Sequence, residues 1–441
     1  MLVDLELCFS IILNTYKLIG EIFIMKIFKN KKRKYIIISS FVSTFVVAGF
    51  IITHYNSIPK EEPLIGAYID GTHSETLPTK GSGYKVEKIA CDNNKNASWD
   101  YNKWGIKLSN WGTRSRCNIY FKSLENITIA DKTFYLDEMQ RCPTMNSDGT
   151  VTVTGIEDTY GYLCKAKDAY GDSYYYRGNV TNNYVLFAGK YWRIIRYNGD
   201  GTVRIIYDGT SAHPNGESSD DRQIGTSAFN SSDNDNAYVG YMYGATGAST
   251  YSATHVNTNN STIKTYLDTW YENNIKGTTN EQYIADNIFC NDRSFAPNNS
   301  GTGAGTSKTY YRWNNFANNS NNNKMMLTCP QKNDAFTVND TNKGNGALTY
   351  GVGLITTDEL VLAGGWNSNN SNYYLYSGQS YWTMSPSSFN GSNAFERRVY
   401  SDGDASGSDN AGDSYGTRLV LNLSSEILKN GNGTASNPYH A

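Results

Sequence analysis

Charge, proline and histidine are scarce in this sequence of 441 residues. Charged residues make up 18% of it, and there are only 9 prolines and 5 histidines. The formal net charge is −2, so the chain lacks the concentrated basic face by which proteins bind nucleic acid. HExxH does not occur, which removes the simplest signature of zinc proteases. No partner of the nucleic-acid class is therefore expected.

Glycine and tyrosine are abundant instead, with 40 and 35 residues. Tyrosine and threonine suit pleated surfaces, whereas asparagine and glycine suit tight turns. A chain so rich in aromatic residues is also not typical of disordered proteins. The composition predicts strands and turns, and the length predicts two or three domains.

One apolar run, Tyr35 to Thr53, contains no charged residue and follows a dense run of lysines and arginine between Lys26 and Lys34. As a helix it would span about 28 Å, close to the hydrocarbon thickness of a bilayer. Cations before the run predict a cytoplasmic N-terminus. We therefore expect residues 35–53 to be a single transmembrane anchor in the cell membrane, with 1–34 cytoplasmic and everything after it extracellular. A cleaved signal peptide ending near Ala48 is the alternative. Residues 1–24 precede Met25 and have the character of a misassigned start.

Seven cysteines are present, and all but Cys8 follow the apolar run. An even number of cysteines in an oxidising compartment indicates disulfides, and pairing of sequence neighbours keeps each bond inside one compact segment. Zinc is disfavoured because CxxC spacing is absent. The expected bonds are Cys91–Cys117, Cys142–Cys164 and Cys290–Cys329.

Local patterns divide the outer part of the chain. Residues 54–66 form a stalk, 67–125 a small β-sandwich-like module, and 126–176 a connector closed by a disulfide, with a hairpin at 147–149. Residues 177–441 form an α+β domain. In it we expect a meander of strands at 184–187, 191–196 and 202–207, and further strands at 354–355, 380–384, 395–400 and 415–423. Helices are expected at 261–275, 281–289 and about 357–362, capped by Ser261 and by Thr356 or Thr357.

Three segments carry a family resemblance: YYYRGNVTNNYVLFAGKYWRIIRYNGDGTVRIIYDGT, IADNIFCNDRS with KMMLTCPQKNDAF, and YWTMSPSSF followed by YGTRLVLNL. They resemble an uncharacterised extracellular family of gut-dwelling Gram-positive bacteria, over about 60% of the chain. The terminal YGTRLVLNL is more distantly similar to the last strand of the C-type-lectin-like fold shared with formylglycine-generating enzymes. The resemblance implies a C-type-lectin-like distal domain. The cysteine pair of those enzymes and the calcium-binding motifs of sugar-binding lectins are both missing.

One loop has the spacing of a calcium site, with oxygen-bearing side chains at alternate positions around Gly407. These residues are Asp402, Asp404, Ser406, Asn410 and Asp413. Because Asx, Gly and Ser runs are common in this chain, a solvated hairpin loop is the simpler interpretation. No cofactor is expected, with calcium as the one open possibility.

Aromatic residues set among Asn, Ser and Gly are typical of binding loops. Such a mixture surrounds Trp366, Tyr373, Tyr374 and Tyr376, the alternative being that these side chains only pack the loop. The isolated histidines 73, 213, 255 and 440 are expected at the surface.

Together these observations predict a membrane-anchored, surface-exposed protein with a non-catalytic binding or adhesion role toward a glycan or protein ligand. An extracellular enzyme on polysaccharide and a structural envelope display protein are the alternatives.

Overall fold

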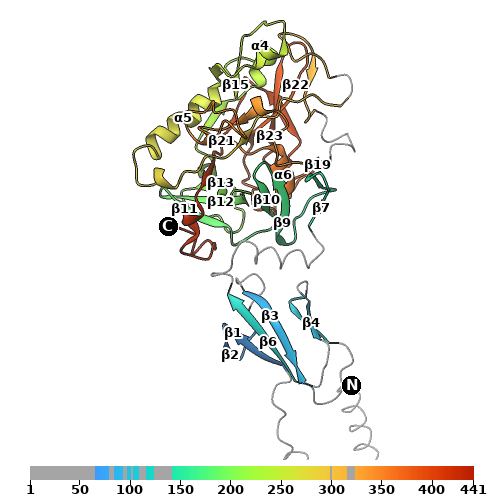
Figure 1. Cartoon of the computed structure of the whole chain (residues 1–441), viewed down its shortest axis with the longest axis vertical. Coiled ribbons are helices and arrows are strands. Elements are labelled where there is room, and N and C mark those ends of the chain that lie inside the picture. Colours follow the sequence, from blue (N-terminus) through green and yellow to red (C-terminus); the bar gives the residue numbers. More distant parts are fainter. Residues whose placement is uncertain are drawn as a thin grey trace, which may run out of the picture. The chain divides into compact units, whose positions relative to one another are not determined.

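A computed structural model describes residues 65–78, 84–92, 97–100, 103–108, 116–123, 142–297, 300–314 and 323–441. The predicted cytoplasmic segment 1–34, the anchor 35–53 and the stalk up to residue 64 lie outside these residues. Among the described residues, no helix is long and apolar enough to cross a membrane. The described chain is mostly β, with few helices and several antiparallel sheets (Figure 1).

The N-terminal β module, residues 65–123, contains a four-stranded sheet and a separate hairpin. The sheet has the order β2 (Thr72–Ser74), β1 (Ile65–Ile69), β6 (Cys117–Ser123), β3 (Tyr84–Cys91), and the hairpin pairs β4 (Ala97–Asp100) with β5 (Gly105–Leu108). Trp99 of β4 packs edge-on against Phe121 of β6 at 5.3 Å between ring centroids. Aromatic packing and the Cys91–Cys117 bond, which joins residues in register, hold this small module together.

The C-terminal domain, residues 142–441, is organised around a seven-stranded sheet. Its order is β21 (Val352–Gly353), β26 (Val420–Leu423), β13 (Val203–Gly209), β12 (Lys190–Tyr197), β10 (Gly171–Gly178), β9 (Gly161–Asp168), with β11 (Tyr184–Phe187) paired to β12. The meander expected at 184–207 is confirmed as β11, β12 and β13. The last strand of the chain in this sheet, β26, inserts between β21 and β13.

The segment expected to be a connector contributes directly to this sheet. β9 and β10 pair along their full length, and β10 also pairs with β12 through Tyr174 and Tyr175. β9 and β10 therefore share one sheet with strands that follow residue 178. Alternating residues of β9 and β10 also build a second, smaller core cluster with Trp313 and Met325. The hairpin at 147–149 is confirmed between β7 (Thr144–Met145) and β8 (Val151–Thr152).

A second sheet lies beside the first. It has the order β14 (Thr226–Ala228), β25 (Ser414–Gly416), β22 (Tyr381–Phe389), β23 (Ala394–Val399), β24 (Gly407–Asn410), with β18 (Thr309–Tyr310) paired to β22. The strand expected at 415–423 is thus divided between the two sheets, as β25 and β26. All of β22 is buried on both faces, which explains why Tyr381 and Trp382 are both in the core despite being neighbours.

Short elements complete the domain. The paired strands are β15 (Met242–Tyr243) with β16 (Asn259–Asn260), β17 (Phe289–Cys290) with β20 (Ala335–Phe336), and β19 (Lys324–Met325) with β8. The α-helices are α4 (Tyr251–His255), α5 (Thr262–Asn274) and α6 (Thr357–Ala363), and the 3-10 turns are η4 (Asp220–Arg222), η5 (Asn236–Val239), η6 (Glu281–Tyr283), η8 (Lys332–Asp334) and η9 (Ser425–Leu428).

Two of the three expected helices are confirmed. The Ser261 side chain accepts the Lys264 N–H at the start of α5, and apolar residues three to four positions apart bury one face of that helix. The helix expected at 281–289 is wrong, because only η6 forms and Phe289 turns into strand β17 to pair with Phe336. Tertiary pairing of a large apolar residue outweighs weak local helix propensity here.

All three expected disulfides are confirmed, with sulfur–sulfur distances of 1.99, 2.02 and 2.05 Å. They indicate an oxidising, extracellular location.

Candidate functional site

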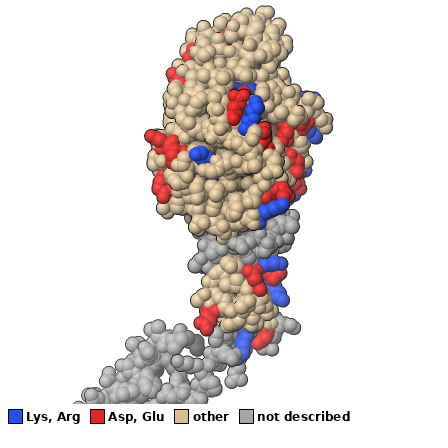
Figure 2. All heavy atoms as spheres, turned by 90° about the vertical axis from the view of Figure 1, so that its left-hand side faces the viewer, with Lys and Arg blue, Asp and Glu red and all other residues tan. Residues whose placement is uncertain are grey.

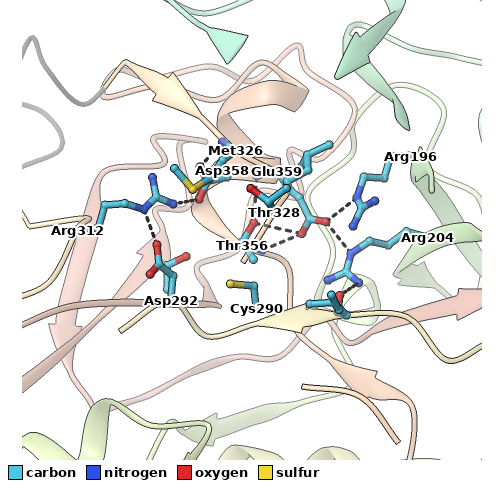
Figure 3. Close-up of a pocket in the computed structure, with 13 residues that line it drawn as sticks. Arg196, Arg204, Cys290, Asp292, Arg312, Met326, Thr328, Thr356, Asp358 and Glu359 are labelled. Atoms are coloured by element: carbon cyan, nitrogen blue, oxygen red, sulfur yellow. Dashed lines mark hydrogen bonds and ion pairs between the residues drawn. The ribbon is translucent and has the colours of Figure 1, made fainter. Parts of the chain in front are cut away.

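A small cavity lies in the C-terminal domain where β12, β13 and the start of α6 meet the segment between β17 and β19 (Figure 3). Its volume of about 20 Å³ holds about one water molecule. The cavity is lined by Arg196, Arg204, Ile288, Cys290, Asp292, Arg312, Met326, Leu327, Thr328, Thr356, Asp358, Glu359 and Ser385.

Glu359 organises one side of this cavity. Its Oε1 lies 2.6 Å from Nε of Arg204 and 3.1 Å from Nε of Arg196. Arg196 in turn lies 2.8 Å from Asp168 at the end of β9. Burial alone would raise the pKa of Glu359, but the two guanidinium groups outweigh it and lower the pKa. Glu359 therefore stays ionised although its side chain is only 3% exposed.

The same glutamate also starts helix α6. Thr356 is the N-cap: its hydroxyl accepts the Glu359 N–H, and its own N–H donates to Glu359 Oε2 at 3.0 Å. This reciprocal arrangement is a capping box, which satisfies two donors of the first turn. A local helix signal thus carries a carboxylate into the buried ion network.

Arg312 organises the opposite side. Its guanidinium lies 2.5 Å from Asp292 and also pairs with Asp358. Burial would lower the pKa of Arg312, but the two carboxylates outweigh it and raise the pKa. Asp358 further accepts the Met326 N–H at 2.8 Å and the Trp313 indole N–H at 3.1 Å. The start of α6 is therefore bound both to Arg312 and Trp313 and to Met326.

The disulfide Cys290–Cys329 holds this wall in place. The two cysteines stand 39 residues apart, and the segment between them supplies Asp292, Arg312 and Met326 to the cavity. Both cysteines are partly exposed. We call residues 291–314 and 323–328 the covering segment.

The chemistry of this cavity is that of a closed ion network. Each carboxylate in its wall, Asp292, Asp358 and Glu359, faces an arginine. A general acid or base needs a carboxyl group within reach of a substrate proton, and a sugar ring needs far more than 20 Å³. The arrangement is suited to joining α6, the main sheet and the covering segment.

The calcium spacing does not assemble into a site. Asp402 accepts the N–H of Asp404 at 3.1 Å, and Asp404 accepts that of Ser406 at 2.7 Å, so both carboxylates close turns of their own loop. Asn410 lies at the far end of β24, and Asp413 follows in the next turn. Among the described residues, no group of three or more His, Cys, Asp or Glu side chains is placed to hold a metal ion.

The aromatic loop is largely internal. Tyr373 and Tyr374 are 2% and 5% exposed and belong to the main hydrophobic core, against which Tyr376 packs. Trp366 is partly buried against the smaller core cluster. The structure therefore brings these residues together as packing, and Tyr373 and Tyr374 do not form a surface for a ligand. In a leucine-poor chain, tyrosine fills the core.

Two histidines expected at the surface are buried. His213 is 8% exposed and lies 3.0 Å from Asp221, whereas His255 is 1% exposed at the end of α4. Burial, reinforced by Arg293, lowers the pKa of His255 to about 2. Its ring contacts Tyr251, and its Nε2 lies 3.4 Å from the Tyr311 hydroxyl. His255 is thus a neutral part of the core.

Most arginine side chains of the described C-terminal domain are buried. Nine arginines are buried: Arg177, Arg193, Arg196, Arg204, Arg222, Arg293, Arg397, Arg398 and Arg418. They donate to carboxylates and to backbone carbonyls, as when Arg222 and Arg418 share Asp208. On the face drawn in Figure 2, residues other than Lys, Arg, Asp and Glu cover most of the domain, and the charged residues form separate patches.

Sequence reasoning missed the ion network, although a signal for it was present. Arg196 and Arg204 stand inside the apolar strands KYWRIIRY and VRIIYDG. An arginine within a strand that is otherwise fully apolar requires a buried acceptor. The sequence alone does not say which acceptor, because Asp168 and Glu359 are distant along the chain.

Comparison with known proteins adds no relative: no family model, no curated protein and no solved structure matches the chain.

Proposed function

We propose that the C-terminal domain is a non-catalytic recognition domain for neutral glycans, displayed outside the cell. One observation carries the proposal: the domain buries nine of its arginines, and several of its exposed loops consist of residues that carry amides and hydroxyls but no charge. Neutral sugars are bound by this kind of group, through hydrogen bonds to hydroxyls and contacts with ring faces.

The composition of the exposed loops supports the proposal. Long stretches such as 244–260 contain Ser, Thr, Asn, Gly and Ala without one Asp, Glu, Lys or Arg. A face without charge offers little attraction to an anionic polymer or to nucleic acid. The disulfides place the domain in an oxidising compartment, which agrees with ligands found outside the cell.

The membrane anchor and the lectin-like fold belong to the same proposal. Residues 35–53 would hold the chain at the membrane, with the C-terminal domain outside. Short helices, antiparallel sheets and long loops, with β26 of the chain's end inserted between β21 and β13 of the main sheet, support a C-type-lectin-like fold. A fold of this type does not by itself specify a ligand.

A glycan array tests the proposal. The full chain, purified in mild detergent with its disulfides intact, is applied to an array of neutral, sialylated and sulfated glycans, with calcium and with a chelator. We expect reproducible binding to neutral glycans in both conditions. A folded sample that binds no neutral glycan, or that releases reducing sugar from an oligosaccharide panel, contradicts the proposal.

A further inference from the structure

We propose that the glycan-binding face lies on the cap, which we define as residues 244–260 together with 294–297 and 300–310. This inference rests on the proposed function, and it adds the location and the ligand contacts. In Figure 1 the cap is the end of the domain that carries α4 and β15, opposite β11.

The cap carries very little charge. The one charged side chain of the cap is Lys308, which lies over the Tyr310 ring at 5.3 Å. His255, the one histidine of the cap, is buried and neutral. Exposed hydroxyls are numerous; they belong to Thr246, Ser249, Ser252, Thr302 and Thr306. Such a face fits a ligand that carries many hydroxyls and no charge.

Two chain segments are joined firmly in the cap. Gly305 N–H donates to the Thr254 hydroxyl at 3.5 Å, and Gly305 O accepts the N–H of Asn236 at 3.0 Å. Gly303 has a φ of +66°, and an added Cβ would stand 2.6 Å from the Tyr251 ring. Only glycine fits there, so the loop lies directly against the ring. The face is therefore preformed, which reduces the entropy lost on binding.

An aromatic pair stands at the centre of this face. Phe295 is 39% exposed and meets Tyr251 edge to face, with ring centroids 5.4 Å apart. The Tyr251 hydroxyl lies 2.9 Å from Gln331 Oε1 and 3.1 Å from Arg293 O, which fixes that ring. Val256, 44% exposed, directly follows the same short helix as its C-cap. A rigid exposed ring bordered by hydroxyls suits the apolar face of a neutral hexose.

Two cap variants test the assignment on the full chain. Phe295→Ala removes the exposed ring, and Ser252→Glu adds one negative charge in the first turn of α4, where the helix tolerates it. Each has a matched control elsewhere on the domain. Leu186→Ala changes a side chain of 38% exposure on β11, and Ser371→Glu adds the same charge at another exposed serine.

The readout is affinity for the neutral glycan that gives the strongest array signal, measured by titration, with circular dichroism as a check of folding. We expect both cap variants to lose at least tenfold in affinity and both controls to stay within twofold. Binding by the wild type that Ser252→Glu and Phe295→Ala both retain overturns the cap assignment and leaves the proposed function standing. Absence of wild-type binding overturns the proposed function, and the assignment with it.

Discussion

Two regions of the C-terminal domain bury titratable side chains in opposite ways. Around the small cavity, Glu359 is 3% exposed, and two arginines keep it ionised. Near the cap, Glu396 of β23 is fully buried, and neither of its carboxyl oxygens has a hydrogen-bond partner in the structure. Burial raises the pKa of Glu396 well above its ordinary value, and Arg293 offsets this only in part, because Asp334 already pairs with Arg293 at 2.6 Å.

The comparison shows that burial alone does not decide the charge of a side chain. Desolvation disfavours the ionised form at both sites, and the partner decides the outcome. His255 follows the Glu396 pattern, since it is buried beside Tyr251 and Tyr311 and stays neutral. The domain therefore joins its elements with ion pairs in one region and fills its interior with neutral polar groups in the other.

Among the changes considered, removal of the Glu359 charge should lower the free energy of unfolding most, because it disrupts the ion pairs around the small cavity. Glu359→Gln keeps the capping box, because glutamine can replace glutamate there, but it removes the counterion of buried Arg204 and one of the two counterions of Arg196. We expect a loss of roughly 3–5 kcal/mol in the free energy of unfolding, measured with urea at pH 7. The control is Glu272→Gln, which removes one partner of the exposed Lys276–Glu272 pair and should have almost no effect. Equal effects for the two variants would contradict the role given to the buried network.

Opening the covering segment tests whether the disulfide supports the same network. In the double variant Cys290→Ser, Cys329→Ser, the unfolded chain regains the freedom of a loop with a separation of 39 residues. The chain-entropy model predicts a loss of roughly 3–4 kcal/mol. The Glu359→Gln change should cost less in this background, since Asp292 and Arg312 are no longer held over the cavity. Strictly additive losses would show that disulfide and network act independently.

The buried neutral His255 should make the free energy of unfolding fall in acid. His255 has a pKa of about 2 in the folded protein, compared with an ordinary value of 6.5, so the unfolded state binds the extra proton below pH 6.5. The stability contribution is complete above pH 6.5 and falls by up to about 1.4 kcal/mol per pH unit as the pH is lowered. We expect His255→Gln to reduce stability at pH 7 but to flatten the dependence between pH 6.5 and 4.5, as measured by urea unfolding. Parallel curves for wild type and variant would refute a buried neutral histidine.

The stability contribution of Glu396 should change with pH in the direction opposite to that of His255. Its pKa is raised in the folded state, so the contribution is complete below the unfolded pKa and is lost as the pH rises, again by up to about 1.4 kcal/mol per unit. Glu396→Gln removes this loss without changing the shape of the side chain. We expect the variant to match the wild type near pH 4 and to exceed it in unfolding free energy at pH 8. A variant that is less stable than the wild type at pH 8 would mean that Glu396 is ionised and paired.

Much of the local structure was predictable because short-range rules determine it. The Ser261 cap of α5, the Thr356 cap of α6, the meander of β11 to β13 and the three disulfides all follow from patterns within a few tens of residues. The failures share one cause, which is that distant partners override local signals. Phe289 joins a strand because Phe336 lies opposite it, and Tyr373 and Tyr374 enter the core because few leucines are available to fill it.

The candidate sites were less predictable than the fold. The spacing of Asp402 and Asp404 matched a calcium loop, yet each carboxylate accepts an N–H two residues on, a local bond that competes with any cation. The cap has no motif at all, since it arises where α4 meets a loop some fifty residues further along the chain.

By itself the sequence determined the disulfide pairs, the strand meander and the helix starts, because caps, turns and cysteine spacing act over short distances. Only the tertiary structure decided which buried charges are paired. Glu359 meets Arg196 and Arg204 across more than 150 residues, whereas Glu396 meets no such partner. An ionised side chain in a low-dielectric interior requires its counterion within a few ångströms, and only the folded chain brings the two together.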